Sequence, residues 1–576
     1  MDKQKVSEIL KEIGVLLELK GENPFKARAY ANAARVIEGW EGDLTSLVQE
    51  GKLSELKGIG EALSQKITEL VRTGHLSYYE ELKKSIPSGL FEMLMIPGLG
   101  PKRIQTIYQK LKLTDMNQLE KACHDHQLRE LEGFGEKTEE RILQGIEFVR
   151  KNESRHRFDV AYAQAQIIFN ALKEDKRIIR SSIAGSLRRH KEIIKDIDIL
   201  VSAHEKDADG LMDSFTSFSQ VNQIVAKGIT KSSVLLKSGI NVDLRVVKDA
   251  EFPYALHHFT GSREHNTSVR SRAKKMGLKL NEYGLFREDE ALIQCKNEEE
   301  IFEALKLTYI PPELRENQGE IEASEQGRIP KLISAKDIKG VFHVHSVWSD
   351  GNASLRDMIQ ACVNLGYEYV GISDHSQAAF YAKGLKEDQV KKQQEELDEL
   401  GEEFKEIQIF KGIEADILAD GSVDYDETIW PRFDFIIASV HSRFGMSQKE
   451  MTQRIIKAME NPYVTFLGHP TGRLILEREP YAVNLHEVID AAHDLGVAME
   501  LNASPYRFDL DWRLCPYAKS KGVKMSIHPD AHSVEGLNVI SLGVGIARKG
   551  WLEAKDVVNT MAVKKIEQFL KKRRNN

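Results

Sequence analysis

Residues 341–351 read VFHVHSVWSDG, in which an apolar, strand-like run carries His343 and His345, and Asp350 follows close behind. Residues two apart on a β-strand point to the same side, so both imidazoles should project together near the strand end. A lone buried histidine is more often structural than catalytic. The stretch therefore becomes informative only if other strands bring similar residues to the same place.

The same pattern recurs through the C-terminal half of the chain. Apolar strands alternate there with helical patterns, and each strand ends in histidine, aspartate, glutamate or asparagine, including Glu500 and Asn502. Parallel strands wrapped by helices into a barrel gather their C-terminal ends on one face, where barrel enzymes hold their active sites. Mixed imidazole and carboxylate ligation suits manganese, zinc or iron better than magnesium or calcium. The candidate metal ligands are His343, His345, Asp350, His375, Glu414, His441, His469, Asp530 and His532.

A second candidate site lies in the middle of the chain. Residues 195–201 read KDIDILV, and the two-residue period of a strand places Asp196 and Asp198 on one face and the isoleucines on the other. A neighbouring strand, NVDLRVV (241–247), offers Asp243 in the same way. Two magnesium ions about 3.5–4 Å apart need such oxygen ligands together with substrate phosphates. The sequence therefore predicts a two-magnesium site.

A phosphate-binding turn precedes these carboxylates. Gly185 and Ser186 open a turn, and Arg188 and Arg189 follow it. Exposed amide groups next to an arginine suit the triphosphate of a nucleotide. Downstream, residues 221–280 carry 11 basic and 4 acidic side chains, a local net charge of +7 in a chain whose net charge is −7. Such a basic surface can bind phosphates even when the whole chain is acidic.

The N-terminal region contains an internal repeat with a Gly-apolar-Gly core. Its three copies are LKGIGEALSQKI (56–67), IPGLGPKRIQTI (96–107) and LEGFGEKTEERI (131–142). Each predicts a helix, a tight glycine turn and a second helix, whose unpaired first amides form a natural seat for a phosphate. The residues placed for such contacts are Gly58, Gly60, Gly98, Gly100, Lys102, Arg103, Gly133, Gly135 and Lys137.

Length and composition set the frame for these sites. A chain of 576 residues is too long for one core, and about four domains are expected. No apolar run reaches the roughly 18 residues of a membrane span, and the polar, acid-containing N-terminus does not resemble a signal peptide. The four cysteines are far apart, which is typical of reduced thiols in a cytosolic protein. We expect a cytoplasmic monomer that does not bind membranes.

The middle of the chain resembles the nucleotidyltransferase fold of family X DNA polymerases, the relatives of DNA polymerase beta. The Gly-Ser turn, the Asp-x-Asp pair and the later Asp243 match that pattern in order and spacing, and residues 259–286 are similar to the family's thumb. The resemblance implies a template-directed polymerase with two Mg²⁺ ions, DNA and deoxynucleoside triphosphates as partners, and Asp196, Asp198 and Asp243 as catalytic residues. The nucleotide-binding residues that it implies are Gly185, Ser186, Arg188, Phe259, Gly261, Asn266 and Arg270.

Two details of this resemblance bear on activity. The vertebrate relatives have Tyr-Phe where this chain has His258 and Phe259, so discrimination against ribonucleotides is not implied. Residues 1–85 are similar to the family's small deoxyribose-phosphate lyase domain, with Lys66 at the Schiff-base position and Lys26 at a phosphate-binding position. The alternative is that Lys66 is an ordinary lysine on the surface of a helix.

The C-terminal ligand set resembles the polymerase and histidinol phosphatase (PHP) domain. That resemblance implies a distorted (β/α)7 barrel, a cluster of three Mn²⁺ or Zn²⁺ ions, and metal-dependent 3′-5′ exonuclease activity, and it leaves open incision at abasic sites. The order of the repeats, palm, thumb and PHP domain along the chain resembles that of a bacterial family X DNA polymerase. This resemblance implies short-gap filling in DNA repair. The implied divisions are a lyase-like helical domain (1–85), fingers with helix-hairpin-helix motifs (86–150), palm (151–250), thumb (251–315), linker (316–338) and PHP domain (339–576).

Two other functions remain open at this point. The C-terminal domain could act as a small-molecule phosphatase, as some PHP relatives do. Its fusion to three repeats that resemble DNA-binding motifs argues against a phosphatase. The chain could also be a DNA-binding protein with inactive catalytic sites, a function that the complete carboxylate and ligand sets disfavour.

Overall fold

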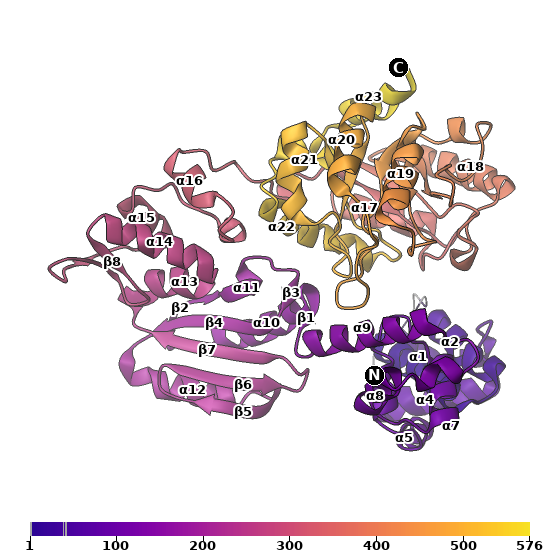
Figure 1. The fold of residues 1–576 in the computed structure, drawn as a ribbon, viewed down its shortest axis with the longest axis horizontal. Helices are drawn as coiled ribbons and strands as arrows, with labels where there is room; N and C mark the ends of the chain where they lie inside the picture. Colours follow the sequence, from indigo (N-terminus) through magenta and orange to yellow (C-terminus); the bar gives the residue numbers. More distant parts are fainter. Residues whose placement is uncertain (1–2, 39, 41–42, 576) are drawn as a thin grey trace. The chain divides into compact units, whose positions relative to one another are not determined.

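The computed structural model describes residues 3–38, 40 and 43–575, which form two units (Figure 1). One unit ends at Glu153 and the other begins at Ser154. Among the described residues, no helix is both long and apolar enough to cross a membrane.

The first unit is helical. A single hydrophobic cluster, which runs from Val6 to Ile146, holds its helices together. Each glycine repeat leads into a helix, namely α4, α7 or α9. The helices are α1 (Lys3–Lys20), α2 (Pro24–Glu38), α3 (Leu44–Gln49), α4 (Glu61–Thr73), α5 (Ser77–Lys84), α6 (Gly89–Met93), α7 (Pro101–Leu111), α8 (Met116–His124) and α9 (Glu136–Asn152).

The second unit begins with a mixed sheet in the order β2-β4-β7-β6-β5. Its central strands β4 and β7 are parallel, and Asp198 pairs in register with Asp243. Because side chains alternate, Ile197 and Ile199 are buried in the core with α10 and α12, while the aspartates face the other side. The elements are α10 (Phe158–Lys173), β2 (Ile178–Ile183), β4 (Asp196–Ala203), α12 (Ala208–Thr216), β5 (Val221–Lys227), β6 (Lys231–Leu236) and β7 (Asn241–Val247).

A smaller helical layer follows this sheet and packs on its own core. It contains α13 (Phe252–Thr260), α14 (Arg263–Lys275), α15 (Glu298–Ala304) and a small sheet of β8 (Leu278–Leu280), β9 (Leu285–Arg287) and β10 (Leu292–Ile293).

The segment 316–338, which we expected to be a linker, contains α16 (Glu320–Glu325). Glu320 is fully buried, and its carboxylate is 2.7 Å from Nδ1 of His265 on α14. A buried carboxylate must be paired, so this contact holds the segment on the preceding helical layer. The segment is therefore a packed connection.

The rest of the chain forms a nearly closed barrel of parallel strands in sequence order, which confirms the predicted (β/α)7 fold. A parallel bridge between Val344 and Ala531 joins the ends of the first and last strands. Aromatic rings, including Phe342, Phe435 and Phe466, fill one end together with α23. The strands are β11 (Gly340–Val344), β12 (Tyr369–Ile372), β13 (Gln408–Asp416), β14 (Phe435–Ser439), β15 (Val464–Leu467), β16 (Ala498–Asn502) and β17 (Met525–His528). The main helices are α17 (Leu355–Asn364), α18 (Glu387–Glu403), α19 (Gln448–Met459), α20 (Leu485–Leu495), α21 (Cys515–Lys521), α22 (Ile540–Lys549) and α23 (Val563–Lys572).

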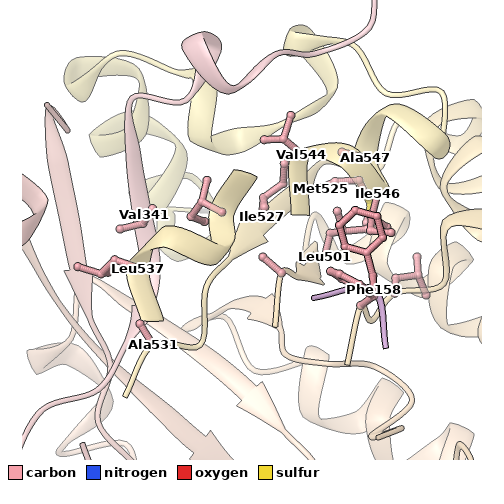
Figure 2. Packing of buried hydrophobic residues seen from close by; sticks show 14 of the residues in the cluster. Phe158, Val341, Leu501, Met525, Ile527, Ala531, Leu537, Val544, Ile546 and Ala547 are labelled. Atoms are coloured by element: carbon pink, nitrogen blue, oxygen red, sulfur yellow. The ribbon is translucent and has the colours of Figure 1, made fainter. Parts of the chain in front are cut away.

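Within the second unit, the mixed sheet and the barrel share one hydrophobic core. Figure 2 shows Phe158 of α10 among barrel residues that include Leu501 and Ile546. The Phe158 ring also meets Phe508 edge-on, with ring centroids 6.5 Å apart. The barrel is therefore packed against α10, the helix that also packs on the sheet carrying the aspartates.

Candidate functional site

Glu414, at the C-terminal end of β13, is the centre of the barrel site. Its carboxylate is buried and lies between histidines from four other strand ends. Burial alone would raise the pKa of Glu414, but the histidines around it lower that pKa well below its ordinary value, so the group is a carboxylate. Its oxygens lie 2.9 Å from His375 Nδ1, 3.0 Å from His469 Nε2, 3.3 Å from His343 Nε2 and His441 Nε2, and 3.7 Å from His345 Nε2.

The other predicted carboxylates complete the cluster. Asp530 Oδ1 lies 3.3 Å from His345 Nε2, and Asp350 Oδ1 lies 3.3 Å from His532 Nε2 and 3.6 Å from His375 Nε2. The structure thus brings all nine predicted residues together. Their ligand atoms form several overlapping groups within 4.8 Å, such as His345, Asp350, His375 and His532. Because these groups of ligand atoms share a carboxylate, the cluster is suited to binding more than one metal ion.

The buried atoms of this cluster fit a metal. His343 Nε2, both ring nitrogens of His345 and Glu414 Oε2 are buried without a hydrogen-bond partner. Such atoms are costly inside a protein unless something else satisfies them, and a cation would do so. Burial, with the neighbouring His532 and His375, lowers the pKa of His345 to about 3, so this imidazole is neutral, as a metal ligand must be.

Three residues around the ligands were missed by the sequence reasoning as site residues. Glu500 on β16 lies 2.7 Å from His343 Nδ1 and 2.8 Å from Nδ1 of His528, and Asp416 lies 2.7 Å from His441 Nδ1. Carboxylates in this position orient an imidazole so that its other nitrogen faces the metal. A local signal existed for all three, because Glu500 had been noted at a strand end, and Asp416 and His528 each lie two residues from a predicted ligand.

The mouth of the barrel site carries exposed aromatic rings. Phe380 and Tyr381, in the connection from β12 to α18, are 84% and 60% exposed. The Tyr381 ring lies 6.5 Å from the His375 ring and 6.4 Å from the His441 ring. Arg507 adds a cation, with Nε 3.5 Å from an oxygen of Asp530. None of the three mouth residues stands out in the sequence.

Asp196 and Asp198 border a separate cavity of about 410 Å³, and Asp243 is not among the residues that line it. Gly185 approaches Asp198 so closely that a Cβ there would lie 2.1 Å from Oδ2, and its φ of +60° also favours glycine. Burial, with Asp196 and Asp243, raises the pKa of Asp198 to about 6, a repulsion that bound cations would relieve. The cavity is lined by Gly185, Ser186, Arg189, Asp196, Asp198, His258, Phe259, Gly261, Arg263, Asn266 and Arg270.

Asp243 has close partners that the sequence did not suggest. Lys231 Nζ lies 2.5 Å from Oδ2, and Ser233 donates a hydrogen bond of 2.6 Å to Oδ1. Both partners are on β6, the strand next to β7. The third carboxylate is therefore held in place from the neighbouring strand.

Arg188, a predicted nucleotide-binding residue, is not among the residues that line this cavity. Its guanidinium points away from the cavity and pairs with the buried Glu298 at 2.6 Å. Consecutive residues on a helical turn point about 100° apart, and here Arg189 is the one that lines the cavity. The buried Glu298 on α15 is paired with two arginines, because Arg315 binds its Oε1 and Arg188 binds its Oε2.

The three glycine turns share one geometry. Gly58, Gly98 and Gly133 have φ of +102°, +79° and +83°, and the apolar residue after each of them is buried. The second glycines, which precede α4, α7 and α9, are Gly60, Gly100 and Gly135.

These second glycines have ordinary negative φ, and a Cβ on any of them would meet no atom within 4 Å. Contacts within the described residues therefore do not require glycine at these three positions. Open space in front of the first amides of a helix is suited to a close external partner such as a phosphate. Lys102, Arg103 and Lys137 lie beside these turns, and all three are exposed.

Comparison with known proteins finds similarity in several parts of the chain. Family profiles match as a helix-hairpin-helix domain (residues 1–76), a SAM-like helix-hairpin-helix tandem (91–147), a DNA polymerase beta thumb (255–316) and a PHP domain (342–504). A DNA polymerase/3'-5' exonuclease PolX from Bacillus subtilis (strain 168) is 39% identical over 575 residues, which cover 99% of this chain and 100% of the relative. The chain belongs to the bacterial PolX family.

Shorter relatives match only parts of this PolX-family chain. A repair DNA polymerase X of African swine fever virus (isolate Tick/Malawi/Lil 20-1/1983) is 30% identical over 168 residues, 27% of this chain and 94% of the viral protein. A probable phosphatase, TTE1963, of Caldanaerobacter subterraneus subsp. tengcongensis is 28% identical over 183 residues, 30% of this chain and 69% of that protein.

The two lysines of the lyase resemblance come together in this PolX-family chain. Lys66 Nζ lies 4.9 Å from the ring centre of Tyr78, and Lys26 Nζ lies 5.7 Å from it. Tyr78 also stacks on Tyr30, with ring centroids 6.2 Å apart. The two cations therefore border one aromatic surface, although they are far apart in sequence.

Proposed function

We propose that this PolX-family protein is a template-directed DNA polymerase that fills short gaps during DNA repair and trims 3′ ends with its barrel. The supporting observation is that two separate acidic sites lie on a chain that also carries three open glycine turns. Its partners are gapped or primer-template DNA and deoxynucleoside triphosphates. We expect it to act as a cytoplasmic monomer.

The palm cavity is the proposed site of nucleotide addition. Asp196, Asp198 and Asp243 would hold two Mg²⁺ ions, which when bound lower the pKa of the primer hydroxyl and neutralise the triphosphate. Arg189 and the amides of the Gly185 turn would bind the triphosphate. Phe259 and Gly261 would border the sugar, Asn266 the base, and Arg270 the template and nascent pair.

The barrel is the proposed nuclease. The nine clustered residues would hold three Mn²⁺ or Zn²⁺ ions, which when bound supply an activated water and neutralise the phosphodiester. Arg507 is placed to hold a phosphate at the mouth. Phe380 and Tyr381 are placed to stack on the base of the 3′-terminal nucleotide, because every base offers a π-face to an exposed aromatic ring.

The domain organisation follows from these assignments. We propose a lyase-like helical domain (1–85), helix-hairpin-helix fingers (86–150), palm (151–250), thumb (251–315) and PHP nuclease (339–576). Residues 316–338 would connect the last two.

The central test uses a gapped duplex with a 5′-labelled primer, in Mg²⁺ or Mn²⁺, with and without nucleotides. The primer is expected to lengthen by the gap size with nucleotides and to shorten without them. Histidinol phosphate offered in parallel tests the phosphatase alternative. Turnover of histidinol phosphate without shortening of a 3′-recessed duplex would replace the nuclease assignment.

Removal of both exposed rings, by Phe380→Ala with Tyr381→Ala, should slow degradation of single-stranded 3′ ends roughly tenfold or more, because base stacking is removed. Metal content and hydrolysis of bis(p-nitrophenyl) phosphate should stay at the wild-type level, since the metal ligands are intact. An equal loss on DNA and on this small diester would mean that the rings support the metal site rather than the base.

DNA affinity should depend less on salt after the second glycine turn is changed. Removing one phosphate-binding cation lowers the log–log salt slope by about 0.9 on duplex DNA, so Lys102→Ala with Arg103→Ala should lower it by up to about 1.8. The matched control is Lys110→Ala, at the far end of α7, where the lysine is exposed. Equal slopes for all proteins would show that Lys102 and Arg103 only face solvent.

The proposed lyase activity depends on Lys66. Borohydride should trap the protein covalently on a 5′-deoxyribose-phosphate end if Lys66 forms a Schiff base. Lys66→Ala should remove the trapped species, while Lys20→Ala, a change of an exposed lysine elsewhere in the same unit, should not.

A further inference from the structure

Lys549, the last residue of α22 in the barrel, is a fully buried lysine. Its Nζ donates to Glu316 Oε1 at 2.6 Å and to the backbone carbonyl of Arg189 at 3.0 Å. An ammonium group inside a protein is unfavourable unless it is paired and hydrogen-bonded. These bonds therefore explain how the lysine is tolerated, and they join the barrel to the polymerase half of the unit.

Glu316 connects Lys549 of the barrel to Arg189, which lines the nucleotide cavity. The same Oε1 accepts a hydrogen bond from Arg189 Nε at 3.1 Å, and Lys191 Nζ lies 3.7 Å from Oε2. Arg189 also donates to the carbonyl of Thr260 and lines the palm cavity. The arginine that faces the cavity is thus held by a carboxylate that a barrel residue holds in turn.

The charges around Lys549 favour this arrangement. Burial lowers its pKa to about 8, against the opposing effect of Glu316, so the ammonium form still dominates at neutral pH. Glu313, whose carbonyl also faces Lys549, has its own carboxylate paired with Arg548 at 2.6 Å. Glu316 is the carboxylate in direct contact with the ammonium group.

We propose that Lys549 is a positioning residue of the polymerase reaction. It holds Glu316 so that this carboxylate orients Arg189 without fully neutralising it, and the guanidinium stays attractive to the triphosphate of an incoming nucleotide. Lys549, Arg189 and Lys191 are three cations around the single anion Glu316. Without Lys549, Glu316 would be compensated by Arg189 and by the more distant Lys191, so the guanidinium would be neutralised more fully. The inference rests on the proposed role of the palm cavity.

This assignment gives the barrel a second role beside its metal site. The helix that ends at Lys549 follows the loop that carries Asp530 and His532, two of the predicted metal ligands. Phe158 and the barrel share one core, so the lysine is fixed with respect to the cavity. The nuclease domain thus contributes a charged group to the nucleotide site.

The test uses three variants of the full chain: Lys549→Met, Lys549→Arg, and Lys549→Met combined with Glu316→Gln. Binding of one deoxynucleoside triphosphate is measured on a primer-template that ends in a dideoxynucleotide, alongside KM and kcat for extension of a normal primer. Lys549→Met should weaken nucleotide binding and raise KM about tenfold, with a much smaller change in kcat, because charge-assisted contacts to the triphosphate weaken. Lys549→Arg should stay near wild type.

The double variant separates charge from packing. Glu316→Gln removes the anion that would neutralise Arg189, so it should restore most of the nucleotide affinity, although it restores no packing. Degradation of 3′ ends should stay within about twofold of wild type in every variant, with all proteins compared below their unfolding temperatures.

Two results would overturn the inference. One is wild-type nucleotide affinity in Lys549→Met, and the other is a double variant that binds nucleotide no better than Lys549→Met. Failure of the wild-type protein to bind nucleotide in the dideoxy complex is a separate outcome. It would refute the palm assignment itself, and this inference with it.

Discussion

Glu414→Gln is expected to abolish degradation of DNA 3′ ends and to leave nucleotide addition intact. Glutamine keeps the shape of the side chain but removes the negative charge that five imidazoles face at 2.9–3.7 Å. Changes to groups that only support metal ligands typically cost 10–100-fold, so loss of a shared ligand should cost more than about 100-fold. The measurements are metal content by elemental analysis and degradation of a 5′-labelled strand.

The matched control is Asp434→Asn, which changes a carboxylate of the same barrel in the same way. Asp434 precedes β14 and accepts a hydrogen bond from the amide of Lys411 at 2.9 Å, so it lies at the other end of the strands. It should keep full metal content and activity. Full degradation by Glu414→Gln, with unchanged metal content, would show that the cluster is a structural ion-pair network.

Asp198→Asn is expected to give the reciprocal result, with primer extension abolished and 3′-end degradation retained. The carboxylate lies in register with Asp243 and against the Gly185 turn, where the cations and the triphosphate of the proposed reaction would meet. Asparagine preserves the packing but removes a charged ligand shared by two ions, so extension should fall more than about 100-fold. The loss of primer extension is measured by single-nucleotide incorporation.

Glu414→Gln serves as the control for Asp198→Asn, and each variant should lose only its own activity. A rate of primer extension by Asp198→Asn within tenfold of wild type would refute the palm assignment. Loss of both activities in both variants, without a change in thermal unfolding, would mean that one site serves both reactions.

Both catalytic sites could be predicted because their signals are local. A strand with polar residues two apart, such as His343 and His345 or Asp196 and Asp198, shows which face they share. Parallel strands in a barrel must then bring their C-terminal ends together, so a ligand set spread over almost two hundred residues converges by topology alone. The glycine turns were visible for a similar reason, since the Gly-apolar-Gly spacing sets the turn directly.

The sequence could not tell Arg188 from Arg189 at the nucleotide site. Both follow the Gly185 turn, and the choice depends on Glu298, a buried carboxylate 110 residues away that claims Arg188. In the same way, Lys231 holds Asp243 only because β6 and β7 are neighbours in the sheet.

The sequence alone determines the fold class, the two candidate metal-ligand sets and the glycine turns, because each of them appears as a short periodic pattern. The partners of those residues depend on the packed chain. Glu500 is 157 residues from the His343 that it orients, and Lys549 is 360 residues from the Arg189 carbonyl that it bonds. A buried polar group takes whichever partner the folded chain places within hydrogen-bond reach, and no local pattern records that choice.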